Sequence, residues 1–104
     1  MERLAFTMYL KPGCEQEYRR RHDQIWPELK ALLKTAGISD YSIFLDPETG
    51  TLFACQRQSG GSSSQELGAN PIVQRWWAYM ADLMETQPDH SPVSKPLLEV
   101  FHLD

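Results

Sequence analysis

The sequence EYRRRHDQIWPELKALL, residues 17–33, repeats its apolar residues at the spacing of an α-helix. At 3.6 residues per turn, one side of this helix carries Tyr18, His22, Ile25, Leu29, Leu32 and Leu33. Charged residues fall largely on the opposite side. The stretch therefore predicts an amphipathic helix whose buried side, with a histidine in it, faces the core.

His22 and Tyr18 lie four residues apart on that buried side, and the pattern has two interpretations. In the first, both are core residues whose polar atoms are satisfied by neighbours, as is usual for buried polar groups. In the second, the buried side lines a pocket, where His22 is an acid or base and Tyr18 a hydrogen-bond donor. The helix alone leaves both open.

Pro27 interrupts the helical pattern. Proline lacks a backbone N–H and clashes with the preceding turn, so we expect either a kink near Trp26 or two abutting helices with Pro27 first in the second. Gly37 follows the last helical residues. It is typical of the left-handed residue that ends a helix.

Alternating or helical spacing predicts the other elements. Strands are expected at 3–10, 40–45, 51–57 and 97–103, and a second main helix at 71–84 after Asn70 as N-cap. Residues 85–96 hold three prolines and should cross the surface as an extended arm. Residues 58–65 are small and polar, and fit either a loop or the start of a short helix ending near Leu67.

The order strand, helix, strand, strand, helix, strand is that of a ferredoxin-like α+β fold, the split β-α-β arrangement. It has a four-stranded antiparallel sheet with both main helices on one face. The strands are apolar on both sides, as Phe6 and Met8 against Ala5 and Tyr9 show. We therefore expect the uncovered sheet face to pair with a second copy, giving a homodimer of the dimeric α/β-barrel type.

Length and charge limit the classes of protein. A chain of 104 residues forms one domain, 1–104, and a net charge of -4 argues against binding nucleic acid. No apolar run resembles a signal peptide or a membrane span, so we expect a cytoplasmic protein with no membrane contact. Cys14 and Cys55 are not spaced as a redox pair, and a disulfide is not expected.

The candidate chemistry is limited. His22, His90 and His102 share no ligand spacing, and the sequence has no phosphate-binding loop or nucleophile motif, so we expect neither a metal nor another cofactor. Trp76 and Trp77 are about 100° apart on their helix, so at most one faces the middle of a cavity. Both tryptophans fit plain core packing, or walls that stack on a sugar whose oxygens bind tyrosines and His22.

Four segments resemble the L-rhamnose mutarotase family, and the similarity runs nearly end to end. They are YRRRHDQIWPEL at 18–29, YSIFLD at 41–46, QRWWAYM at 74–80 and DHSPV at 89–93. The resemblance implies a dimeric ferredoxin-like enzyme that interconverts the α and β anomers of L-rhamnose. It implies His22 as proton donor, and Tyr18, Tyr41, Trp76 and Trp77 as substrate-binding residues.

Residues 60–65 depart from the family pattern, which is more helical and contains an aromatic residue, and we expect this departure to touch no site residue. Mutarotation needs a proton given to the ring oxygen and one taken from the anomeric hydroxyl. His22 is expected to give the first, while Tyr18, Asp40 and water remain open as the base. The alternatives are a sugar-binding module without catalysis and a dimeric-barrel oxygenase or haem-handling protein.

Overall fold

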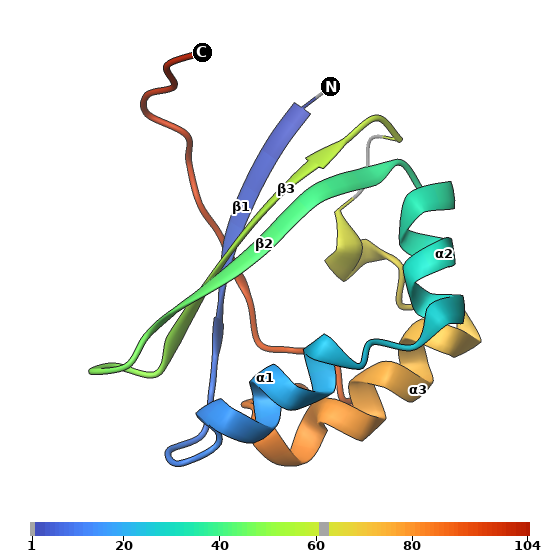
Figure 1. The fold of residues 1–104 in the computed structure, drawn as a ribbon, viewed down its shortest axis with the longest axis vertical. Coiled ribbons are helices and arrows are strands. Elements are labelled where there is room, and N and C mark those ends of the chain that lie inside the picture. The colour runs from blue at the N-terminus through green and yellow to red at the C-terminus, as the bar shows by residue number, and fades with distance from the viewer. Residues whose placement is uncertain (1, 61–62) are drawn as a thin grey trace.

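The computed structural model describes residues 2–60 and 63–104. Its elements are β1 (Glu2–Tyr9), α1 (Glu15–Asp23), α2 (Pro27–Thr35), β2 (Ile38–Asp46), β3 (Thr51–Gln58), η1 (Ser64–Glu66), α3 (Pro71–Met80), η2 (Ala81–Leu83) and β4 (Lys95–Pro96). The sheet order is β2-β3-β1-β4 with antiparallel pairing, and Figure 1 shows the helices on one side of it. The ferredoxin-like α+β prediction is confirmed.

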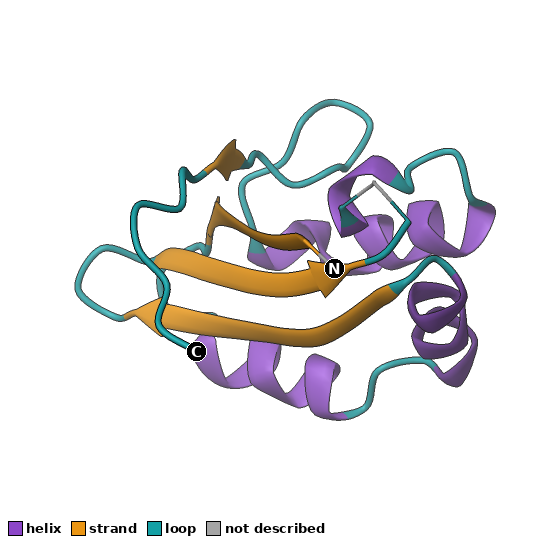
Figure 2. Cartoon of the chain, turned by 90° about the horizontal axis from the view of Figure 1, so that it is seen from above, coloured by secondary structure: helices purple, strands orange, loops and turns teal. Residues whose placement is uncertain are grey.

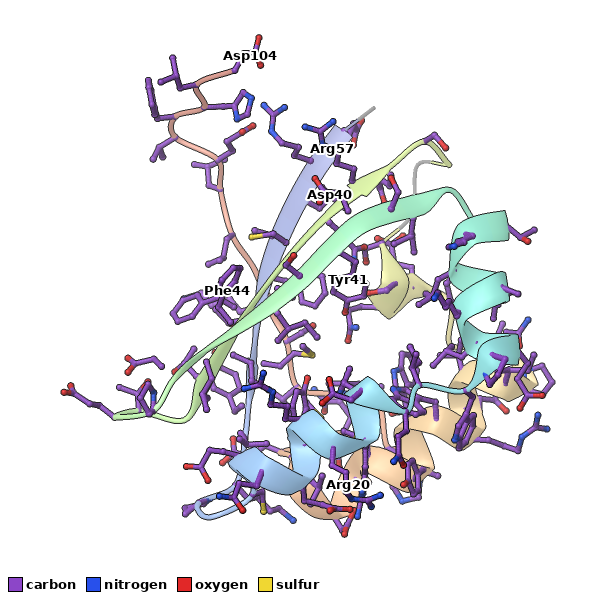
Figure 3. All side chains as sticks on the ribbon, in the orientation of Figure 1. Arg20, Asp40, Tyr41, Phe44, Arg57 and Asp104 are labelled. Carbon is purple, nitrogen blue, oxygen red and sulfur yellow. The ribbon has the colours of Figure 1, made fainter. Side chains whose placement is uncertain are left out.

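The sheet separates two kinds of surface. Toward the helices, Phe6, Met8 and Leu52 are buried in the core. On the opposite face, Phe44 and Phe53 are paired across β2 and β3, and Phe44 remains 65% exposed. Figure 3 shows Tyr41 and Phe44 projecting to opposite sides of β2. The two faces of β2 therefore follow the alternation of its sequence.

Pro27 divides the first helical region into two helices, which confirms the second of the two expected outcomes. Trp26 has extended backbone angles, φ -60° and ψ 130°, as a residue before proline prefers. Pro27 then occupies the first position of α2, where a missing N–H costs no hydrogen bond. α1 and α2 consequently run in different directions in Figure 1.

Arg21 joins α1 to the end of α3. Its guanidinium donates to the Tyr79 carbonyl oxygen at 2.7 Å and to the Asp82 carboxylate at 2.8 Å. It also pairs with Glu17 at 2.8 Å and lies 4.5 Å from the centre of the Tyr79 ring. Because Arg21 precedes His22, these contacts hold the histidine turn against α3.

The predicted fourth strand at 97–103 was wrong. β4 covers only Lys95–Pro96, and the last ladder-like contact is the Leu97 N–H to the Ala5 carbonyl at 2.9 Å. Beyond it the chain is drawn as loop in Figure 2, and Leu98 and Val100 are 86% and 89% exposed. Alternation marks residues suited to a strand, but among residues 2–60 and 63–104 no surface covers the side chains of Leu98 and Val100.

The other segments differ from prediction mainly at their ends. The helix expected at 71–84 is α3 followed by the single turn η2, and Asn70 caps it as predicted by accepting from the Ile72 N–H. Residues 58–65 were expected to form either a loop or the start of a short helix. The short helix is confirmed as η1, a single 3₁₀ turn that Ser63 caps. Residues 61 and 62 lie outside the described residues.

Two glycines in left-handed backbone give a matched test of the sheet–helix junction. Gly13 and Gly37 have φ of 80° and 86°, but a Cβ at Gly13 meets no atom within 4 Å. A Cβ at Gly37 would lie 2.6 Å from Ser59 Oγ and 2.9 Å from the Gly60 nitrogen. Gly13→Ala should lower the free energy of unfolding by about 1 kcal/mol through backbone strain alone. Gly37→Ala should cost at least about 1 kcal/mol more in urea unfolding, and equal losses would contradict the close approach.

Candidate functional site

A cavity of about 910 Å³ lies between the sheet and the helices. All five residues that the sequence nominated line it: Tyr18, His22, Tyr41, Trp76 and Trp77. They come from α1, β2 and α3, so the fold gathers residues that are up to 59 positions apart in the sequence. Figure 3 shows the Tyr41 side chain directed toward the helical side, where this cavity lies.

His22 sits among aromatic rings. Its imidazole centre is 4.4 Å from the Tyr18 ring and 5.4 Å from the Trp76 ring, with the second contact nearly perpendicular. The side chain is only partly buried and lines the cavity. The histidine is therefore a wall residue of a hollow and not an enclosed core residue.

The contact between His22 and Tyr18 fixes the state of the imidazole. His22 Nδ1 lies 3.1 Å from the backbone carbonyl oxygen of Tyr18, which only accepts hydrogen bonds, so Nδ1 carries a proton. Burial lowers the pKa of His22, against the opposing effects of this hydrogen bond and of Asp23. The neutral ring thus has its free lone pair on Nε2, the atom available to exchange a proton with a ligand.

Trp76 is held in place by a second layer of rings. Trp26 crosses it edge to face at 5.1 Å, and Tyr79 lies 5.7 Å from it at a tilt. Trp76 is 8% exposed. This packing orients the indole that contacts His22. Trp76 is therefore both a core-packing residue and part of the pocket wall, so both interpretations of the tryptophans apply to it.

Trp77 lines the same cavity from the next position of α3 and is also 8% exposed. Its six-membered ring lies against the backbone at Gly68. A Cβ built at Gly68 would be 2.7 Å from Trp77 Cζ3 and 3.0 Å from Cη2. Only a residue without a side chain leaves the indole in this position.

The two tyrosines of the cavity are hydrogen-bond donors at neutral pH. Burial raises the pKa of Tyr18, and the neighbouring Tyr41 adds to the increase. Burial also raises the pKa of Tyr41, although a hydrogen bond from Ser64 opposes it. Both phenols therefore keep their protons, and Tyr18 is poorly suited to act as a base.

Ser64 and Gln65 also line the cavity, and neither was a candidate from the sequence. Ser64 Oγ is 3.4 Å from Tyr41 Oη, and Gln65 lines the cavity beside it. The expectation that residues 60–65 touch no site residue was therefore wrong. No signal in the sequence indicated this contact, because only the tertiary fold brings Ser64 to Tyr41.

The arm that follows η2 reaches the site. A smaller cavity of about 40 Å³ shares the five nominated residues and is also lined by Thr86, His90 and Pro92. Thr86 and Pro92 form an isolated β-bridge within the arm. His90 lies between them in the sequence and has a left-handed backbone, with φ 71°. The segment predicted as a surface arm thus also forms part of the pocket wall.

Asp40 lies on the rim of the larger cavity, in β2 before Tyr41. Its carboxylate pairs with Arg57 at 3.4 Å and is 71% exposed, and Figure 3 shows the two residues together. Across the described ranges 2–60 and 63–104, no three His, Cys, Asp or Glu side chains are grouped as a metal site.

Comparisons with known proteins agree on one family. The family model described as L-rhamnose mutarotase matches residues 3–103. Proteins named L-rhamnose mutarotase from Bacteroides thetaiotaomicron and Phocaeicola vulgatus are 64% and 62% identical, each over the full length of both chains. A crystal structure of L-rhamnose mutarotase from Formosa agariphila is 57% identical, covers all of both chains and has a TM-score of 0.93.

The lowered pKa of His22 gives a pH dependence of stability. In the unfolded chain, His22 binds a proton with its ordinary pKa of 6.5, whereas in the folded chain it does so only at lower pH. His22 should therefore make the free energy of unfolding fall as the pH drops below 6.5, and this contribution should level off below the folded pKa of His22. Urea unfolding from about pH 5 to about pH 8 should show a larger loss in the native chain than in His22→Gln, which keeps only the contributions of other groups such as Glu17. A gain in stability on acidification relative to His22→Gln would contradict the lowered pKa of His22 in the folded chain.

Proposed function

The chain belongs to the L-rhamnose mutarotase family, and from this premise we propose how its cavity converts one anomer of L-rhamnopyranose into the other. The enzyme is an isomerase of the aldose 1-epimerase type. One observation supports the mechanism most strongly: an imidazole that keeps its Nδ1–H on the Tyr18 carbonyl oxygen, and so exchanges protons with a ligand through Nε2, in an aromatic cavity between helices and sheet.

Ring opening moves one proton to the sugar and one away from it. The ring oxygen gains a proton as its bond to the anomeric carbon breaks, and the anomeric hydroxyl loses one as it becomes a carbonyl. The aldehyde then rotates and closes on its other face, which reverses both transfers. A single group that gives the proton to the ring oxygen during opening takes it back during closure.

We assign the proton of the ring oxygen to His22 Nε2. Burial makes the imidazolium a stronger acid than it is in water by lowering its pKa, and leaves the neutral form ready to recover the proton on closure. The backbone carbonyl of Tyr18 supports both states, because it accepts the Nδ1–H in each. This is the role that the family resemblance implied.

Tyr18, Asp40 and water are the candidates for the group that accepts the anomeric proton. The raised pKa of Tyr18 makes its phenol a donor and removes it from consideration as the base. Asp40 is tied to Arg57 at an exposed rim position. This ion pair favours water as the acceptor, with Tyr18 and Tyr41 binding sugar oxygens.

The cavity walls suit a 6-deoxy sugar. Trp76 and Trp77 offer apolar faces for the C–H surface of the pyranose, and Ile25 and Leu29 add aliphatic surface. A C5 methyl group leaves no hydroxyl to satisfy in such surroundings, whereas a hydroxymethyl group needs a polar partner. We therefore propose L-rhamnose as the preferred substrate.

We also propose that the enzyme is a cytoplasmic homodimer that binds no nucleic acid. Support for the dimer comes from exposed apolar side chains on the outer sheet face and in the C-terminal segment: Phe44, Phe53, Leu97, Leu98, Val100, Phe101 and Leu103. The net charge of -4 disfavours a nucleic-acid surface. In the described residues, no helix is long and apolar enough to cross a membrane.

Saturation-transfer NMR on L-rhamnose tests the role of His22. Catalytic amounts of the native enzyme should accelerate exchange between the two anomer signals. His22→Ala should lower the rate about a hundredfold to ten-thousandfold, the effect of losing one acid–base group. His102→Ala removes a histidine outside the cavity and should leave the rate unchanged. Full activity in folded His22→Ala would overturn the assignment, and ligand binding without any exchange would indicate a non-catalytic module.

The dimer proposal is tested on the outer sheet face. Phe44→Asp places a charge among apolar side chains and should shift the protein from dimer to monomer in sedimentation velocity. Gln16→Asp adds the same charge to an exposed position of α1 and should keep the dimer. An interface of standard size associates at about micromolar concentration. If the native protein sediments as a monomer there, the dimer proposal is refuted.

A further inference from the structure

The hydrogen bonds between Gln56 and Ser64 have a fixed direction. The Ser64 N–H donates to Gln56 Oε1 at 2.8 Å, and an N–H only donates, so this atom of the carboxamide is the oxygen. The Gln56 NH₂ group therefore faces Ser64 Oγ, to which it donates at 3.0 Å. Gln56 is 2% exposed, so water does not compete for these contacts.

Ser64 Oγ has one proton and two lone pairs to place. The lone pairs receive the NH₂ groups of Gln56 at 3.0 Å and of Gln65 at 3.4 Å. The proton is left for Tyr41 Oη at 3.4 Å, the contact in which Ser64 is the donor. Tyr41 thus accepts from Ser64, and its own proton is free for another acceptor.

We propose that Ser64 is a positioning residue for the mutarotase reaction: held by Gln56, it makes the Tyr41 hydroxyl a hydrogen-bond donor toward the bound sugar. The inference deepens the proposed function and rests on it. The matching sugar atoms are oxygens that only accept, namely the ring oxygen of the closed form and the aldehyde oxygen of the open form. An open-chain intermediate would gain most from such a donor, because its carbonyl carries the developing negative charge at closure.

Local structure supports this arrangement. Ser63 caps η1 with its side chain on the Gln65 N–H at 3.2 Å, and Glu66 returns a contact to the Ser63 N–H at 3.4 Å. This capping box fixes the turn that presents Ser64. The raised pKa of Tyr41 keeps its proton in place throughout the reaction.

A double-mutant cycle on turnover tests the proposal. Ser64→Ala should lower kcat about threefold to tenfold, the effect of one neutral hydrogen bond, and Ser64→Thr, which keeps the hydroxyl, should restore it. In a Tyr41→Phe background, Ser64→Ala should have no further effect. An equal loss in both backgrounds, or no loss from Ser64→Ala, would overturn the proposal, since a structural role alone does not depend on the Tyr41 hydroxyl.

Gln56→Glu gives an independent test with a pH readout. An ionised carboxylate only accepts hydrogen bonds, so the Ser64 O–H would donate to it instead of to Tyr41, and the Tyr41 hydroxyl would turn back to donate to Ser64. The ratio of variant to native activity should fall as the pH rises and the introduced carboxyl group ionises. A ratio that stays constant with pH in the folded variant would overturn the proposal. Absence of exchange in the native enzyme would instead refute the proposed function.

Discussion

The missing N–H of Pro27 is the constraint on which the site depends. A continuous helix from Glu15 to Thr35 would keep one direction, but α1 ends at Asp23 and the chain restarts at Pro27 as α2 in another direction. α1 is then free to lie beside α3, where Arg21 joins it to Tyr79 and Asp82. Residues of both α1 and α2 then line one cavity, with His22 on its wall.

The fold could be predicted largely from spacing. Strand alternation and helical spacing indicated the element order, and local rules for Pro27, Gly37 and Asn70 placed three helix boundaries. The failure at β4 has a different cause. Alternation in 97–103 reports which side chains suit a strand, but within the described chain nothing covers them, and sequence pattern carries no information on where a covering surface lies.

Residue type and spacing raised the aromatic and histidine residues of α1 and α3 as candidates but left core packing open as an alternative. The family resemblance selected them, and they do line one cavity. The sequence pattern missed Ser64 because serine in a polar stretch resembles ordinary loop, and its importance depends on Gln56, which lies eight residues earlier in the core of β3. It also left the role of His90 and its arm undecided, since a proline-rich segment can run anywhere over a surface. Contacts between distant segments of this kind are set by the tertiary fold.

The contact between Gly68 and Trp77 has a consequence for how the enzyme could diverge. Any Cβ at position 68 would press on the six-membered ring of Trp77, which lines the cavity. A substitution at position 68, which does not line the cavity, would thus push the Trp77 indole toward the ligand and reduce the cavity volume. The size of ligand that fits can therefore change through position 68 while the reactive groups stay the same. A larger residue at position 68 would require a smaller residue at position 77.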